Sequence, residues 1–365
     1  MKVNVLYPTR IKLSNTGDIL INIMLIRELS KHSNVYFDGK LSIDVKEAIE
    51  INNPYVNNFI YPKMLFGNYS NFPVIRWFNF NLKIIKIQYV FDVPGHLIVS
   101  DSPMSILKSI KDLLRASILR ILGIKLYKIG VTLDIHGSFS ILLQRYLSRF
   151  YCKIGVRDDK NFELLQKNEF KNICLINDLA LLFCIDDFKL KDFEYRNPNA
   201  IIISFRGSTF EKQYDNEYFS KIKEYLFRNL NKPEFIDKNL IFCYQVEEDI
   251  EVINDLYILF HKTHKCQIIN NRLSFKSAIL LYQKTSFILT NRLHVAILGI
   301  LCGSTSYIIS DVKLHSKVIN VFEKLDFKNL VFNIDNREID INENVNQDKI
   351  IQYRIEIQKF IKELF

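Results

Sequence analysis

An arginine and a histidine stand two residues apart in TNRLHVAILGILCG, residues 290–303, at the head of an otherwise apolar run. The apolar residues 287–289 predict a strand, and a helix is expected to follow with Asn291 as its N-cap and Arg292 and His294 in its first turn. An anion bound there would gain from the helix dipole and from a bidentate guanidinium, and the imidazole could carry a proton near neutral pH. The alternative is an internal arginine–carboxylate pair and an interfacial histidine.

A second candidate stretch is SNTGD, residues 14–18, between the first predicted strand and its helix. Gly17 permits a close approach of the backbone, and Asp18 is expected to cap the helix. Asp18 is also a candidate general base for a substrate hydroxyl. Capping alone would explain the same residues.

Three more candidates follow predicted strands. In SFRGSTF, residues 204–210, Arg206 offers a cation and Ser208 a hydroxyl in a flexible loop that could hold an anion. Arg157 in GVRDD and Gln245 in CYQVEED stand at equivalent places. Each of these residues could instead be structural, Arg206 as a surface arginine in a polar loop.

The elements that must position these residues alternate between short β-branched or aromatic runs and longer amphipathic stretches, which predicts βα units on parallel sheets. The fold class is therefore α/β with two Rossmann-like domains facing across a cleft. The charged segment 186–199, closed by Asn-Pro, separates them. The predicted division is an N-terminal domain over 1–190 that forms the acceptor side, a donor-binding domain over 200–345, and an amphipathic helix over 346–365.

Composition narrows the class of protein. The chain has 365 residues, 48% of them hydrophobic and 24% charged, and a formal net charge of +9. No apolar run is long enough to span a membrane and no secretory signal is visible, so a cytoplasmic protein is expected. The basic residues form no arm or stacking motif, which argues against nucleic acid. Six scattered cysteines are expected to be reduced core residues, and no metal site is predicted.

Taken in order, SNTGD, GVRDDKNFELL with INDLALLF, SFRG, YQVEED and TNRLHVAILGILCG resemble the polysaccharide pyruvyl transferase family. The resemblance covers about residues 3–328, and RLHVAILGILCG is its most specific motif. The Arg-Leu-His of the family falls on Arg292–His294, and its donor-binding arginine falls on Arg206. One difference is that a glycine-rich GGG segment common in the family is replaced by VPGHLIVSDSP, residues 93–103.

The resemblance implies a glycosyltransferase-B-like fold, phosphoenolpyruvate as donor substrate with no further cofactor, and a sugar of a surface polysaccharide or its lipid-linked precursor as acceptor. Arg206 and Arg292 would hold the donor, His294 would act as general acid or phosphate contact, and Asp18 would be a candidate base. The chief alternative is a glycosyltransferase of the same fold that uses a nucleotide sugar. A non-catalytic sugar-binding protein of an envelope complex is a third reading. Peripheral contact with the inner face of the membrane is suggested by KSIKDLLRASILRIL, residues 108–122.

Overall fold

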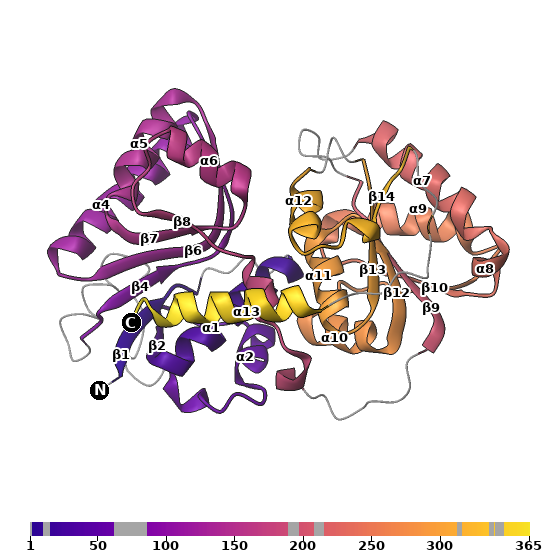
Figure 1. Ribbon diagram of the computed structural model, residues 1–365, viewed down its shortest axis with the longest axis horizontal. Coiled ribbons are helices and arrows are strands. Elements are labelled where there is room, and N and C mark those ends of the chain that lie inside the picture. The colour runs from indigo at the N-terminus through magenta and orange to yellow at the C-terminus, as the bar shows by residue number, and fades with distance from the viewer. Residues whose placement is uncertain are drawn as a thin grey trace. The chain divides into compact units, whose positions relative to one another are not determined.

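The computed structural model describes residues 2–9, 15–61, 86–188, 197–207, 215–311, 316–335, 339 and 347–365. Contacts divide the chain into two compact units. Unit 1 holds Met1–Lys12, Asp18–Leu182 and Arg354–Phe365, and unit 2 holds Leu13–Gly17 and Phe183–Tyr353. Each unit is an α/β domain built on a parallel sheet, so the predicted α/β class with two Rossmann-like domains is confirmed (Figure 1).

The unit boundaries differ from the predicted ones in two places. The division lies between Leu182 and Phe183, ahead of the charged segment that was expected to form the linker. The predicted C-terminal helix is present as α13 (Asp348–Lys362), but its end belongs to unit 1: the Arg354 Nε donates to the Leu181 carbonyl at 3.0 Å and the Tyr127 hydroxyl donates to the Leu364 carbonyl at 3.2 Å. These hydrogen bonds place the end of the chain in unit 1.

The sheet of unit 1 is parallel throughout, and β5 pairs with the second half of β6. Its other strands run in the order β3 (Phe59–Ile60), β2 (Ser33–Phe37), β1 (Val3–Tyr7), β4 (Tyr89–Asp92), β6 (Lys125–His136), β7 (Tyr151–Val156) and β8 (Ile173–Leu175), and β5 is Gly95–Ser100. Its helices are α1 (Thr16–His32), α2 (Ile43–Glu50), α4 (Pro103–Ile121), α5 (Ser138–Ser148) and α6 (Asp159–Lys167), with the end of α13 (Asp348–Lys362). β3 and β4 were not predicted, since one is very short and the other ends just before Pro94.

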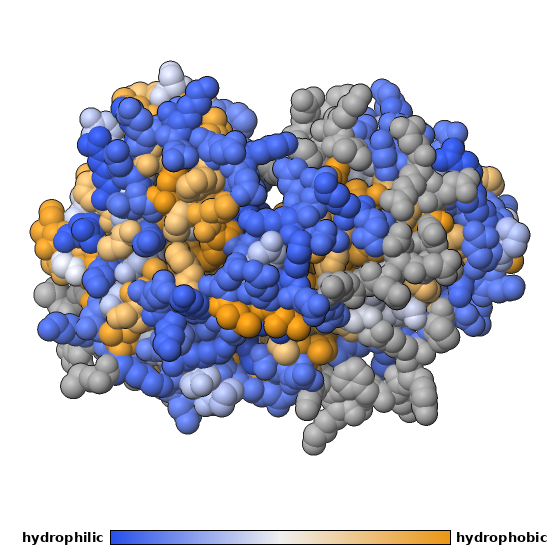
Figure 2. All heavy atoms as spheres, in the orientation of Figure 1, coloured by the Kyte–Doolittle hydropathy of each residue, from blue (hydrophilic) through white to orange (hydrophobic). Residues whose placement is uncertain are grey.

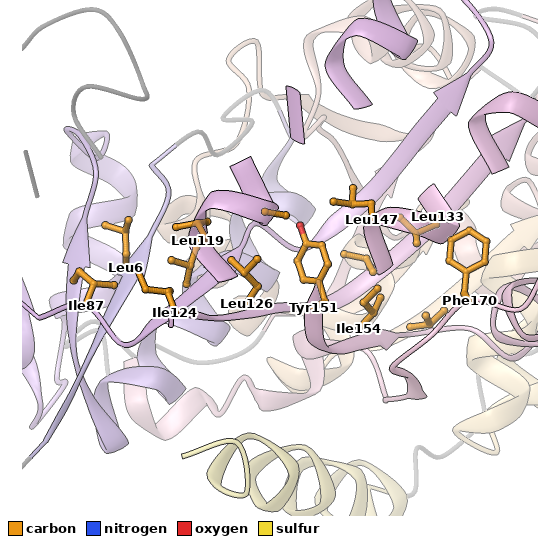
Figure 3. Packing of buried hydrophobic residues seen from close by; sticks show 14 of the residues in the cluster. Leu6, Ile87, Leu119, Ile124, Leu126, Leu133, Leu147, Tyr151, Ile154 and Phe170 are labelled. Atoms are coloured by element: carbon orange, nitrogen blue, oxygen red, sulfur yellow. The ribbon is translucent and has the colours of Figure 1, made fainter. Parts of the chain in front are cut away.

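One face of this sheet packs against α4, α5 and α6 through a continuous apolar cluster. Leu119 of α4 and Leu147 of α5 lie over the strand residues Leu126 and Ile154 in Figure 3. All four residues are at most 3% exposed, so burial of this face stabilises unit 1.

The sheet of unit 2 is also parallel, in the order β11 (Lys265–Ile268), β10 (Asn239–Phe242), β9 (Asn197–Ser204), β12 (Thr285–Thr290), β13 (Thr305–Ser310) and β14 (Val331–Asn333). The helices α7 (Asn216–Leu230), α8 (Pro233–Ile236) and α9 (Ile250–Phe260) lie on one side of this sheet in Figure 1, and α10 (Phe275–Lys284), α11 (Leu293–Leu301) and α12 (Ser316–Lys324) on the other. The strand order reverses direction at β9 and β12, and ligands bind beside such a reversal in open parallel sheets.

Two further expectations can be compared with the structure. Among the described residues no helix is long and apolar enough to cross a membrane. All six cysteines are free thiols, but only Cys243 and Cys302 are buried. The expectation of six core cysteines was therefore wrong for the other four, which are partly exposed: Cys174 and Cys266 lie in the edge strands β8 and β11, Cys152 stands near the start of β7, and Cys184 lies in a loop.

Candidate active site

The two predicted site arginines meet because their strands are neighbours. β9 and β12 pair in parallel with Ser204 opposite Thr290, and Arg206 and Arg292 each follow two residues later. The carboxyl ends of parallel strands lie at the same edge of a sheet, so Arg206 and Arg292 come to the same place. They do so although Arg206 and Asn291, the residue before Arg292, are 85 positions apart in the sequence.

Asn291 holds the main chain of Arg206. Its side-chain oxygen accepts from the Arg206 N–H at 2.9 Å, and its amide nitrogen donates to the Arg206 carbonyl at 2.9 Å and to the Tyr218 hydroxyl at 3.1 Å. The Tyr218 hydroxyl lies 3.3 Å from Ser310 Oγ at the end of β13. Asn291 is 0% exposed, so its side chain positions Arg206 from within the fold.

The predicted N-cap role of Asn291 was therefore wrong. Helix α11 begins at Leu293, and the residue at its N-cap position is Arg292, whose side chain makes no capping hydrogen bond. The Arg292 N–H donates to Thr290 Oγ1 at 3.0 Å. The side-chain amide of Asn291 instead bonds the N–H and the carbonyl of Arg206, just after β9. These main-chain groups would lose their partner if Asn291 capped the helix.

Arg292 forms an ion pair with Asp249, which stands just before α9 and after β10. The Arg292 side chain is 17% exposed and that of Asp249 is 4% exposed. Burial raises the pKa of Asp249, whereas the Arg292 and Arg206 guanidinium groups oppose that shift. One carboxylate thus orients Arg292 among groups that are largely shielded from water.

The two arginines also influence each other electrostatically. Burial, together with the positive charge of Arg292, lowers the pKa of Arg206 to about 10. Arg206 therefore remains a cation at neutral pH, but its charge is less favourable than that of an arginine in water. A bound anion would relieve both the repulsion and the loss of hydration.

His294 lies in the first turn of α11, as predicted, and its ring lies against the backbone of Gly17. A Cβ on Gly17 would stand 2.7 Å from Cγ of His294, so this position has no room for a side chain. Thr16 fixes the same turn to unit 2, since its hydroxyl donates to the Leu273 carbonyl at 3.0 Å. The first turns of α1 and α11 therefore meet at His294.

The predicted capping role of Asp18 was wrong as well. Helix α1 begins at Thr16, and the side-chain oxygen of Asn15 accepts from the Gly17 N–H at 2.9 Å, which is the N-cap bond. Asp18 lies in the first turn of the helix, half-buried, and belongs to unit 1. There its negative charge still complements the positive end of the helix dipole.

The remaining candidates are Gln245 and Arg157, whose side chains make internal hydrogen bonds, and Ser208. Gln245 is 2% exposed, and its amide donates to the Tyr282 hydroxyl at 2.6 Å, so its side chain supports the core of unit 2. Arg157 belongs to unit 1. It donates from Nε to Thr132 Oγ1 at 3.0 Å and pairs with the Asp178 carboxylate at 3.2 Å. Ser208 lies outside the described residues.

Asp249, Tyr218 and Ser310 were not predicted as site residues. Asp249 is part of the segment YQVEED, in which Gln245 was the candidate because it stands closer to the end of β10. Tyr218 lies inside a helix and Ser310 at the end of a strand, and neither carries a local signal of a polar network. In the described part of the chain no cluster of histidine, cysteine and acidic residues is arranged to hold a metal ion.

The cluster contains Arg206, Arg292 and the imidazole of His294, together with Thr16 and Gly17 at the start of α1, and all of these residues belong to unit 2. Helix N-termini present N–H groups to anions, and guanidinium groups bind carboxylates and phosphates through paired hydrogen bonds. Such an arrangement suits a small ligand that carries two separate anionic groups, with the imidazole available to transfer a proton.

The family model described as polysaccharide pyruvyl transferase matches residues 15–310, which include every residue of the cluster. No sequence among the curated proteins is significantly similar to this chain.

Solved structures with a similar fold include UDP-GlcNAc 2-epimerases and HepE of Anabaena. The epimerase of Neisseria meningitidis, bound to UDP-GlcNAc, has a TM-score of 0.56 and 12% identity over 99% of this chain and 100% of its own. That of Methanocaldococcus jannaschii has a TM-score of 0.54 and 14% identity over 98% and 92%. Anabaena HepE, in complex with UDP and glucose, has a TM-score of 0.52 and 9% identity over 99% and 100%. These likenesses support the glycosyltransferase-B-type fold.

Proposed function

This chain belongs to the polysaccharide pyruvyl transferase family and is a transferase, and from that premise we propose that it transfers the pyruvyl group of phosphoenolpyruvate to a sugar. The acceptor is a residue of a surface polysaccharide or of its lipid-linked precursor, and the product is a cyclic ketal that bridges two hydroxyl groups.

The observation that carries this proposal is the convergence of Arg206, Arg292 and His294 at the ends of β9 and β12. Phosphoenolpyruvate carries its carboxylate and its phosphate on the same central carbon, and two guanidinium groups beside helix N-termini match that pair of charges. Because the arginines supply the charge neutralisation, the reaction as proposed uses no metal ion or cofactor.

In the proposed reaction, one sugar hydroxyl adds to the central carbon of the donor while the methylene carbon receives a proton. A second hydroxyl then attacks the central carbon, and inorganic phosphate leaves that carbon with the electrons of the broken C–O bond. His294 is the proposed general acid, either toward the methylene carbon or toward the departing phosphate.

Asp18 remains the proposed base that accepts a hydroxyl proton. It follows Gly17 directly in α1, and Gly17 is the residue whose backbone contacts His294. The half-buried carboxylate is accessible enough to exchange a proton with a substrate.

A nucleotide-sugar donor is the second candidate. It is favoured by the solved structures of similar fold, two of which hold UDP-GlcNAc or UDP. The cationic cluster could bind the phosphates of such a donor in place of phosphoenolpyruvate. A shared fold does not decide between the two donors, because unrelated chemistries occur on the same fold.

Thermal stabilisation distinguishes the donors. We expect phosphoenolpyruvate at a hundred times its Kd to stabilise the protein by about 2.7 kcal/mol, and a panel of UDP-sugars to have no effect. Arg206→Ala and Arg292→Ala should abolish this response. Arg272→Ala is the matched control, because Arg272 is an arginine of the same unit that forms an ion pair with Glu247 at 3.9 Å. Stabilisation by a UDP-sugar but not by phosphoenolpyruvate would favour the second candidate.

The proposed place of action is the cytoplasm at the inner face of the membrane, where lipid-linked saccharides are accessible. Support comes from helix α4, which exposes Met104, Leu107, Leu114 and Ile121 beside basic side chains. Fractionation of cells into soluble and membrane pools, with and without a salt wash, tests this location.

A further inference from the structure

Two helices of unit 1 expose a continuous set of large apolar side chains. On α4, Met104 is 77%, Leu107 58%, Leu114 60% and Ile121 84% exposed. Successive members are three or seven residues apart, so they lie along one side of the helix. The buried residues of α4, Ser109, Ala116 and Leu119, lie on its other side, against the sheet.

Helix α5 packs beside α4 and extends this set. Phe139, Leu142 and Tyr146 have the same helical spacing and are 45%, 39% and 46% exposed. We call these three residues, with Met104, Leu107, Leu114 and Ile121, the α4–α5 surface. In Figure 2 apolar side chains interrupt the polar surface at the left of the view, where α4 and α5 lie in Figure 1. Large apolar side chains exposed together on neighbouring helices mark an interaction site.

The charges around the α4–α5 surface indicate what covers it. Lys108, Lys111 and Arg120 of α4 are exposed, as is Arg149 just after α5. The two helices together contain one acidic residue, Asp112, which is half-buried. The surface is thus apolar along its centre and positive along its borders, which complements a layer of anionic headgroups over acyl chains.

Tyr146, at the border of the α4–α5 surface, also suits a layer of anionic headgroups over acyl chains. The Arg149 guanidinium lies 4.8 Å from the centroid of the Tyr146 ring, so the ring offers an apolar body beside a polar, cationic tip. Side chains of this kind bury their apolar parts while the charged end stays in water, as at a membrane interface. A second copy of this chain would bring the same positive borders face to face, which opposes self-association.

We propose that the α4–α5 surface docks unit 1 onto an anionic phospholipid membrane. Met104, Leu107, Leu114 and Ile121 enter the boundary between headgroups and acyl chains, and Lys108, Lys111 and Arg120 contact lipid phosphates. The proposal deepens the proposed function by assigning the membrane contact to named residues, but it does not depend on which donor unit 2 binds.

Flotation with vesicles tests the proposal on the full chain. We expect binding to vesicles that contain phosphatidylglycerol, weaker binding to pure phosphatidylcholine, and release by salt. Leu114→Glu and Ile121→Glu should each weaken binding by about tenfold, because a charge replaces an apolar group in the interface. Lys108→Gln and Lys111→Gln should each weaken binding to phosphatidylglycerol vesicles by about fivefold.

Ile43→Glu is the matched control, because Ile43 is 75% exposed on α2 of the same unit but lies outside the α4–α5 surface. It should bind vesicles as the unchanged protein does. Far-ultraviolet circular dichroism and thermal melting check that each variant is folded. Phosphoenolpyruvate should stabilise Leu114→Glu and Ile121→Glu as it does the unchanged protein, so failure of donor binding and failure of docking are distinguishable.

Three outcomes would overturn the proposal. The first is a lack of vesicle binding by the unchanged protein, and the second is equal loss of binding in Ile43→Glu and Leu114→Glu. The third is a protein that is dimeric in sedimentation, becomes monomeric with Leu114→Glu, and binds vesicles equally in both forms. That result would assign the α4–α5 surface to a second copy of the chain.

Discussion

The backbone of Gly17 lies directly against the imidazole ring of His294. The two residues come from the first turns of different helices and are far apart in the sequence, yet both belong to unit 2. The contact explains why a glycine stands at this position: any side chain there would displace the ring of the proposed general acid.

Gly17→Ala is therefore expected to lower kcat by about a hundredfold, the size of effect that follows from a small displacement of a catalytic group. Steady-state pyruvyl transfer measures this. The control is the same substitution in a His294→Ala background, where it should cost little more because the displaced group is already absent. Equal losses in both backgrounds would mean that Gly17 acts independently of His294.

His294→Ala is expected to lower kcat by about 10² to 10⁴-fold, the usual contribution of a general acid. Stabilisation by phosphoenolpyruvate should persist, because the arginines hold the donor. His261→Ala, at an exposed position after α9, is the control and should be fully active. A His294→Ala protein with normal turnover would remove this residue from the mechanism, and one that no longer binds the donor would assign it to binding.

Asn291→Ala removes the partner of two main-chain groups of Arg206 and of the Tyr218 hydroxyl. We expect a loss of about 2 to 4 kcal/mol in the free energy of unfolding, since buried polar groups are left unsatisfied, and weaker donor binding. Urea unfolding and a donor titration measure the two effects. Asn231→Ala is the control, because its amide bonds the Phe227 carbonyl at the solvent-exposed end of α7. Similar losses in both variants would count against a special role of Asn291.

Asp249→Asn leaves the Arg292 guanidinium without its carboxylate partner. Because both side chains are largely buried, we expect a loss of about 3 kcal/mol in the free energy of unfolding. The value of kcat/KM for the donor should also fall, since Arg292 is no longer held in one orientation. Glu247→Gln is the control, as the Glu247 carboxylate is 64% exposed. Unchanged kinetics in Asp249→Asn would show that Arg292 needs no such support.

The pH dependence of stability should report on Asp92 in unit 1. Its carboxylate accepts two hydrogen bonds from Arg115, at 2.7 and 2.9 Å, and one from the Tyr151 hydroxyl. Burial opposes ionisation, but the charges of Arg115 and Lys128 and these hydrogen bonds together lower the pKa of Asp92. The folded state therefore releases this proton more readily than the unfolded chain does.

It follows that the stabilisation by Asp92 is complete above the unfolded pKa of about 4 and is lost as the pH falls through the lower folded pKa. At pH 7 we expect Asp92→Asn to lower the free energy of unfolding by about 2 to 3 kcal/mol, less than for a fully buried pair, because Arg115 is partly exposed. The difference between the two proteins should shrink in acid. A difference that is the same at pH 7 and at pH 3 would contradict this account.

The sequence by itself determined the class of fold and most of its elements. Alternating apolar runs predicted parallel strands and helices, and a helix does follow the strand that ends at Thr290, although it begins at Leu293 with Arg292 at the N-cap position. Arg206, Arg292 and His294 could be chosen because cationic residues directly after strands are a local signal. The resemblance to pyruvyl transferases was carried by the same short motifs, and the family match confirms it.

Only the tertiary structure decided which of these residues act together. Strand order depends on long-range burial, and the pairing of β9 with β12 brings Arg206 to Arg292. Arg157 follows β7 in the other unit and pairs there with Asp178. The same is true of Asp249 and Gly17, whose partners are remote in sequence. Local patterns specify what a segment becomes, whereas the neighbours of its ends are set by the packing of the whole sheet.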